Sequence, residues 1–209
     1  GGLIVAIISN ATTILDAGAF SASLGSMVLI KTLTASSSGT LSFVHGSASV
    51  VLDSTYPVYL FKFLNVHAAT DTANFTFNGS IDSGSNYNVH KTSSYFYASH
   101  EEGGSNGQVS YNTNNDLAQG TGFQIINEEC ANDGDASGSG EMYLFSPSST
   151  TFLKHFIGRA NNYHRANITN DNNFSGYFNT TSAINAIQFK FSSGNIGSGI
   201  IKLYGIKDS

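Results

Sequence analysis

The chain has few charged residues: Asp, Glu, Lys and Arg make up 11% of its 209 residues, against about 25% in an average soluble domain. The surface is therefore expected to consist mainly of Ser, Thr, Asn and Gly. A net charge of -5 gives weak repulsion between copies, which suits a protein held in an assembly. The nine Lys and Arg residues form no run, so we expect no nucleic-acid partner.

Cysteine and tryptophan are scarce as well. The single cysteine, Cys130, excludes a disulfide within the chain and favours a small buried hydrophobic side chain. Carboxylates surround it in "NEECANDGD", and they raise a thiol pKa and disfavour a nucleophilic role. The absence of Trp removes the side chain most often used to stack against sugar rings.

The sequence also lacks long apolar runs and the common catalytic motifs. The segment "LIVAII" is too short to span a bilayer and no basic residues precede it, so we expect neither a membrane partner nor a secretory signal. The letters G-x-S-x-G occur only in "GGSNG", residues 103–107, within an almost wholly polar stretch that does not predict a nucleophile elbow; H-E-x-x-H is absent, and the glycine-rich turns lack a phosphate-binding lysine. We therefore expect no enzymatic activity and assign no catalytic residue.

What the sequence does contain is strand-like alternation and enough apolar residues for a core, with 15 Phe and 10 Tyr. In "VYLFKFLNV", residues 58–66, both alternating sets are mostly apolar, which predicts a central strand covered on both sides. Clusters of Gly, Ser, Asn and Asp separate such runs at short intervals. This pattern predicts an all-β protein, a single antiparallel β-sandwich of jelly-roll-like type.

The last strands are expected to close the fold. Ile187, Phe189 and Phe191 alternate on one run, and Ile201 and Leu203 alternate on the next, with a glycine-serine turn between the two. We interpret the pair as a hairpin whose apolar face completes the core.

Residues 1–26 depart from this rhythm and form an N-terminal arm or a first strand ahead of the sandwich domain, 27–209. Their apolar residues fit a short helix or a strand equally well. An exposed apolar segment is a liability on a free monomer, so the functional interpretation is that the arm docks on a neighbouring subunit. The candidate docking residues are Leu3, Ile4, Val5, Ile7 and Ile8.

The acidic segment "NEECANDGDASGSGE" is a candidate calcium site, with Glu128, Asp133, Asp135 and Glu141 as ligands. Calcium takes six to eight oxygen ligands, and a Gly-rich loop can wrap one ion. The spacing is not that of an EF-hand, and the commoner alternative is a solvated acidic turn. No other cofactor is expected.

Two aromatic segments, "SSYFYASH" and "NNYHRAN", are candidates for contact with a host-surface glycan. Tyrosine rings can stack on sugars, and polar neighbours can bind the hydroxyl groups. The alternative is that these rings belong to the core. The candidate residues are Tyr95, Tyr97, Tyr163, His164 and Arg165.

Several longer segments, read together, resemble structural proteins of tailed bacteriophages, mainly marine ones. They are "LIKTLTASSSGTLSFVHG", "LDSTYPVYLFKFLNVHAATD", "SGSNYNVHKT", "GEMYLFSPSSTTFLKHFIG" and "NTTSAINAIQFKFSSGNIGSGIIKLYGI". The resemblance covers about residues 27–206, and the last segment is its most distinctive part. It brings no catalytic residue to this chain.

The resemblance implies a virion component with a β-sandwich domain, made in the host cytoplasm. We expect a non-enzymatic capsid decoration or tail-associated subunit, a homo-oligomer whose partners are other virion proteins. One alternative is a receptor- or polysaccharide-binding module of a tail fibre. Another is a hydrolase acting on surface polysaccharide, which requires two carboxylates facing one groove.

Overall fold

The structure is a computed structural model that describes residues 7–9, 12–16, 19–20 and 26–208, and these residues contain strands and no helix. The first three strands form a separate small antiparallel sheet, and the rest form one 12-stranded sheet. The strands are β1 (Ile7–Ser9), β2 (Thr12–Asp16), β3 (Ala19–Phe20), β4 (Met27–Ser38), β5 (Leu41–Val44), β6 (Val58–Ala68), β7 (Ala73–Ser80), β8 (Lys91–Glu101), β9 (Gly107–Tyr111), β10 (Gln124–Cys130), β11 (Gly138–Phe145), β12 (Lys154–His164), β13 (Ile168–Phe178), β14 (Ala186–Phe191) and β15 (Ile196–Ile206).

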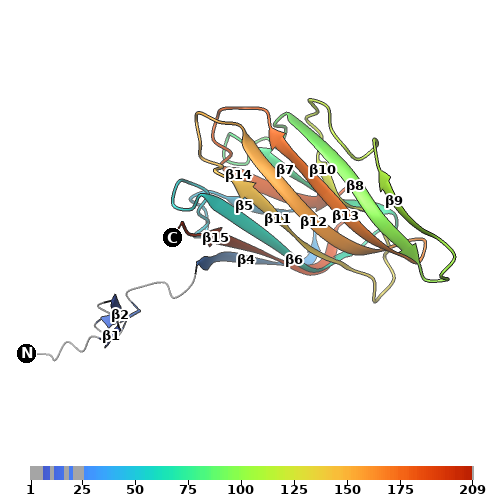
Figure 1. Cartoon of the computed structure of the whole chain (residues 1–209), viewed down its shortest axis with the longest axis horizontal. Helices are drawn as coiled ribbons and strands as arrows, with labels where there is room; N and C mark the ends of the chain where they lie inside the picture. The colour runs from blue at the N-terminus through green and yellow to red at the C-terminus, as the bar shows by residue number, and fades with distance from the viewer. Residues whose placement is uncertain (1–6, 10–11, 17–18, 21–25, 209) are drawn as a thin grey trace, which may run out of the picture.

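The 12-stranded sheet folds into two layers, and its strand pairs are antiparallel. The eight-stranded layer has the order β4-β15-β6-β11-β12-β13-β8-β9, and the four-stranded layer has the order β10-β7-β14-β5. Figure 1 shows β11, β12, β13, β8 and β9 in succession across the larger layer. The layers join where Cys130 of β10 pairs with His164 of β12. The antiparallel sandwich expected from the sequence is confirmed.

The chain passes repeatedly from one layer to the other. Strands β4, β6, β11 and β15 lie in the eight-stranded layer, whereas β5, β7, β10 and β14 lie in the four-stranded layer. This alternation is typical of a jelly roll. Two hairpin-like additions, β8 with β9 and β12 with β13, widen the larger layer beyond β11.

A cluster of phenylalanine rings fills the space between the layers. Phe189 of β14 lies at its centre and is fully buried. Its ring centroid is 5.3 Å from those of Phe61 and Phe63 on β6, and 6.4 Å from that of Phe77 on β7. Phe77 in turn contacts Phe156 of β12 at 5.1 Å. Edge-on and tilted ring contacts of this kind add to the stabilisation gained by burial.

The C-terminal strands bury the predicted side chains but do not form the predicted hairpin. Ile187, Phe189, Phe191, Ile201 and Leu203 are all buried. However, β14 pairs with β5 and β7, while β15 pairs with β4 and β6 in the other layer. The glycine-serine turn is a crossing between layers, because each strand fills a gap between two earlier strands. The hairpin interpretation was wrong.

The prediction that β6 is covered on both sides was also wrong. Tyr59, Phe61 and Phe63 face the core and are buried, but Leu64 on the opposite face is 39% exposed. Leu60 on that face is buried although no second layer formed by the described residues covers it. Its neighbours in register are Tyr143 and Tyr204, so aromatic side chains of adjacent strands flank it instead.

Candidate functional site

The aromatic residues expected to contact glycan do not share one surface. Tyr95 is fully buried, and its hydroxyl donates a hydrogen bond to Oδ1 of Asn172 at 2.6 Å. A ring enclosed in the core cannot stack on a sugar, so the assignment of Tyr95 to a glycan contact is corrected. The alternation of β8 leaves Tyr97 half-buried on the same face, where its hydroxyl accepts a hydrogen bond from Gln108.

The other three glycan candidates lie together at the end of β12. His164 and Arg165 both contact Glu129, with Nε2 of His164 at 3.3 Å and Nε of Arg165 at 2.6 Å from its carboxylate. The backbone N–H of Ala166 donates to Nδ1 of His164, so Nε2 carries the proton. Burial lowers the pKa of His164. The hydroxyl of Tyr163 donates to Asn167, so all three side chains are engaged within the protein.

Three of the sequence-predicted residues meet in one small polar cavity. Tyr97, Glu128 and His164 line a cavity of about 130 Å³ together with Ser99, Gln108, Ile168 and Asn170. Glu128 accepts hydrogen bonds from the side-chain amides of Asn112 at 2.8 Å and Asn170 at 3.1 Å, and from that of Asn115. The sequence predicted these three residues for two different sites, and strand pairing brings them together.

Behind Glu128 the interior is polar rather than apolar. Asn172 donates to the side-chain oxygens of Asn127 at 3.0 Å and Asn162 at 2.7 Å. Asn162 donates to the backbone carbonyl of Glu128. The four asparagines Asn127, Asn162, Asn170 and Asn172 are each at most 2% exposed. This network fixes the glutamate in place, because buried amides need partners with defined geometry.

The four candidate calcium ligands are spread over the molecule. Glu128 lies in the polar cavity, and Asp133 and Asp135 lie in the exposed turn between β10 and β11. Glu141 lies within β11, 3.0 Å from Nζ of Lys62. The described residues hold no group of three or more His, Cys, Asp or Glu side chains placed to bind a metal.

The buried Cys130 and Lys91 both have strongly shifted pKa values. Burial raises the pKa of the Cys130 thiol to about 12, which makes it a poor nucleophile. Burial lowers the pKa of Lys91 to about 7, and its Nζ donates to Asn78 Oδ1 at 2.6 Å and to the carbonyl of Val89 at 2.9 Å. Lys91 is fully buried, so its amine is closed to a substrate.

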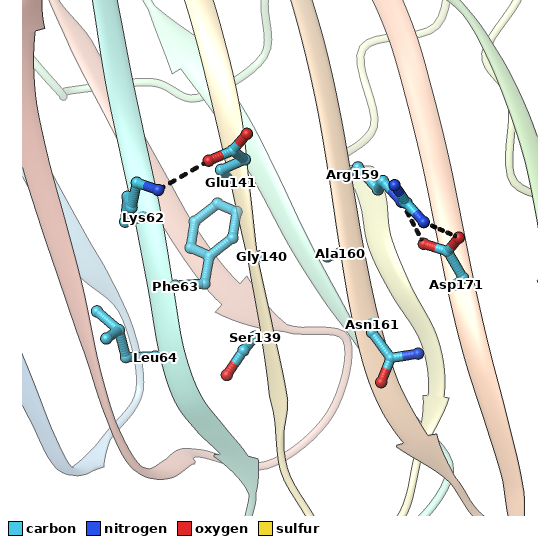
Figure 2. A pocket seen from close by; sticks show the side chains of 10 residues that line it. All are labelled: Lys62, Phe63, Leu64, Ser139, Gly140, Glu141, Arg159, Ala160, Asn161 and Asp171. Carbon is cyan, nitrogen blue, oxygen red and sulfur yellow. Dashed lines mark hydrogen bonds and ion pairs between the residues drawn. The ribbon is translucent and has the colours of Figure 1, made fainter.

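The outer face of the eight-stranded layer carries an open groove of about 570 Å³ that the sequence did not indicate. Figure 2 shows two ion pairs on opposite sides of it. Lys62 pairs with Glu141 on one side, and Arg159 pairs with Asp171 through two hydrogen bonds of 2.8 Å on the other. Only Glu141 had been singled out from the sequence. The residues that line the groove come from four strands, so no local sequence motif could have revealed it.

The same outer face carries an apolar row that runs across five strands in register. Leu29 and Ile157 lie at its ends and are 51% and 54% exposed. The register joins these two through Tyr204, Leu60 and Tyr143. Strands lie about 4.8 Å apart, so the row spans on the order of 19 Å. We call these five residues the outer apolar row.

The proposed docking residues of the arm fall mostly outside the described part of the chain. Leu3, Ile4 and Val5 lie outside the described residues, and Ile7 and Ile8 belong to β1, which pairs with β2. The described segments of the arm are therefore strands, and strand was one of the two structures, helix or strand, that the sequence allowed for it.

The comparisons with known proteins add no relative: no protein-family model, curated protein or solved structure matches the chain. Within the described part of the chain, no helix has the length and hydropathy needed for a membrane crossing.

Proposed function

We propose that the chain is a non-enzymatic structural subunit of a tailed-bacteriophage virion, a capsid decoration or tail-associated protein that binds its neighbours by surface complementarity. The outer apolar row carries this proposal. Leu29 and Ile157 are each more than half exposed on a broad strand surface and are joined by an apolar row, and exposed apolar side chains gathered on one face are typical of protein interaction sites. The low charge of the chain and its resemblance to phage structural proteins support the same function.

We propose no enzymatic role because of how the two carboxylates in the groove are bonded. Glu141 and Asp171 both line it, which is the arrangement that a polysaccharide hydrolase requires. However, glycoside cleavage needs one carboxylic acid that holds a proton. Glu141 and Asp171 are each bonded to a cation of their own, Lys62 and Arg159, so we assign neither carboxylate a catalytic role.

Co-sedimentation with virions that lack the protein tests the proposal. We expect Ile157→Asp and Leu29→Asp to abolish uptake, because a charge in the row must be desolvated on docking. Phe152→Asp is the matched control, because Phe152 is 73% exposed on a loop outside the row. Uptake of the row variants at the level of the control would refute the role of the row. Removing residues 1–26 tests the arm in the same assay, and we expect this deletion to abolish uptake as well.

A second candidate function is polysaccharide or receptor binding as a module of a tail fibre. The groove favours it, because polar side chains from β6, β11, β12 and β13 converge there on the exposed face. A glycan array with the purified protein tests it. Specific retention on any surface glycan supports this function, and an array without signal excludes it for the glycans displayed.

A further inference from the structure

Strand register places Glu141 of β11 directly opposite two cations, Lys62 of β6 and Arg159 of β12, and opposite charges at such positions ordinarily attract. Glu141 bonds to Lys62. Arg159 bonds instead to Asp171 of β13, which lies diagonally across from it, because its partner in register is Asn173. The two pairs therefore lean away from each other, and Figure 2 shows the space that this leaves over β11 and β12.

Strand backbone and one short side chain form the floor of that space. Gly140 and Ala160 lie opposite each other on β11 and β12, and because their side-chain positions face the core, they line the groove with backbone. Ser139 faces outward, as Glu141 does on the same strand, but its side chain is short. The groove is bordered by Leu64 on one side and by Asn161 on the other. Its volume of about 570 Å³ falls within the range of ligand-binding clefts.

The polar groups around the groove balance in charge and mix donors with acceptors. Two cations and two carboxylates line it, so a charged ligand gains no net attraction. Arg159 uses Nε and Nη2 for Asp171, and a guanidinium has five N–H donors, so Nη1 stays available. Beside Nη1 of Arg159, the carboxylate oxygens of Glu141 can accept hydrogen bonds. Hydroxyl groups both donate and accept, and they match such an array.

We propose that this groove binds a neutral, hydroxyl-rich ligand, namely a stretch of uncharged polysaccharide. The proposal rests on the second candidate function and gives it a location and a ligand class. Glu141 accepts hydrogen bonds from sugar hydroxyls, and Arg159 and Asn161 provide the complementary polar contacts. Leu64 provides the apolar edge against which the C–H face of a sugar ring packs.

The test is isothermal titration of the whole protein with two panels of oligosaccharides, neutral ones from dextran, mannan and galactan, and acidic ones from alginate and polygalacturonate. We expect binding of a neutral oligosaccharide and none of the acidic ones. Glu141→Gln and Asn161→Ala should each weaken binding by about tenfold or more, the effect of losing a hydrogen bond to a charged or well-placed polar group. Thr34→Ala is the control on the same layer, since Thr34 lies on edge strand β4 and is exposed.

The outcomes separate this inference from the functions above. A neutral oligosaccharide that binds both groove variants as tightly as the parent overturns the groove and leaves the second candidate function standing. Preference for acidic oligosaccharides overturns the charge argument. An absence of binding to both panels overturns the inference, and an array that is silent as well removes the second candidate function. Virion uptake is measured separately, so none of these results bears on the structural role. Thermal unfolding of each variant shows whether it is folded.

Discussion

The interior of the sandwich has two halves of different chemistry. Between β5, β6, β7 and β14 it consists of phenylalanine rings, with Phe189 at the centre. Around the polar cavity, between β8, β10, β12 and β13, it contains a network of buried amides, with Asn172 bonded to both Asn127 and Asn162. We call these the aromatic half and the amide half. Both are closed to solvent, although different forces hold them.

The difference shows how one fold uses two kinds of burial. Apolar burial is non-directional and scales with the area removed from water, so the aromatic half supplies most of the stability. Buried amides gain little net free energy from their hydrogen bonds, but each unmade bond is expensive. The amide half therefore fixes the register of β10, β12 and β13, and it holds Glu128 at the polar cavity.

The largest effect is expected in the aromatic half. Phe189→Ala should lower the free energy of unfolding by about 3 to 5 kcal/mol, because the ring is fully buried and its loss leaves a cavity among five other phenylalanines. Urea unfolding followed by circular dichroism measures it. Phe152→Ala removes the same group from an exposed loop and should leave the midpoint unchanged. Similar midpoints for the two variants would place Phe189 outside the core.

A smaller loss is expected in the amide half. Asn172→Leu keeps the branched shape of the side chain but leaves the Tyr95 hydroxyl and the oxygens of Asn127 and Asn162 without their partner. Each buried unpaired group costs about 1 to 3 kcal/mol, and relaxation should limit the total to about 2 to 4 kcal/mol. The same urea titration measures it. Asn173→Leu, one residue along β13 on the other face, is the control. Equal stability of the two variants would mean that the network is dispensable.

The aromatic half could be predicted from the sequence and the amide half could not. Tyr59, Phe61 and Phe63 alternate with other residues on β6, and apolar alternation indicates which side faces the core. In β13 the sequence is "ITNDNNFSGYF", where Asn170 and Asn172 face inward and Asp171 and Asn173 outward. Polar residues on both faces give no inside-outside signal, and only partners distant in sequence make inward asparagines stable.

The candidate site was predictable only in fragments for the same reason. Tyr97, Glu128 and His164 were each singled out, but their meeting depends on the order β8, β13, β12 and the single contact between β10 and β12. The outer groove depends on Lys62 and Glu141, which are far apart in sequence and paired across β6 and β11. Local spacing carries no information about such pairs. The C-terminal hairpin failed likewise, because a turn between layers and a turn within a sheet use the same residues.

Lys91 lies where the aromatic half and the amide half meet. Its shifted pKa predicts that the stability of the protein depends on pH. Its Nζ bonds to Asn78 and lies 5.6 Å from the ring of Phe178. Burial lowers its pKa to about 7 from 10.5, so between these values the unfolded chain binds one proton more than the folded chain. Stability should therefore rise as pH increases from 7 to 9, by up to about 1.4 kcal/mol per pH unit.

Urea unfolding at pH 7, 8 and 9 measures this slope. Lys91→Met removes the titrating group and should flatten the rise, whereas Lys62→Met, on the exposed face, should keep it. The upper limit of pH 9 keeps tyrosine ionisation out of the window. The unfolded Cys130 thiol ionises at about pH 8.5, whereas burial raises its pKa in the folded protein, and this lowers the slope equally in the parent and in both lysine variants. A Lys91→Met variant with the slope of the parent would show that the amine is charged in the folded protein throughout.

The smallest effect is expected on the outer face, where the same kind of polar contact is open to water. Arg159 bonds Asp171 through two hydrogen bonds, yet the guanidinium side chain is 71% exposed, and solvent competes for both groups. Arg159→Ala should leave the urea midpoint unchanged within error, in contrast to Asn172→Leu on the neighbouring strand β13. A loss as large as that of the buried amide would mean that this face is covered in the free protein, which a shift in sedimentation coefficient on dilution would reveal as self-association.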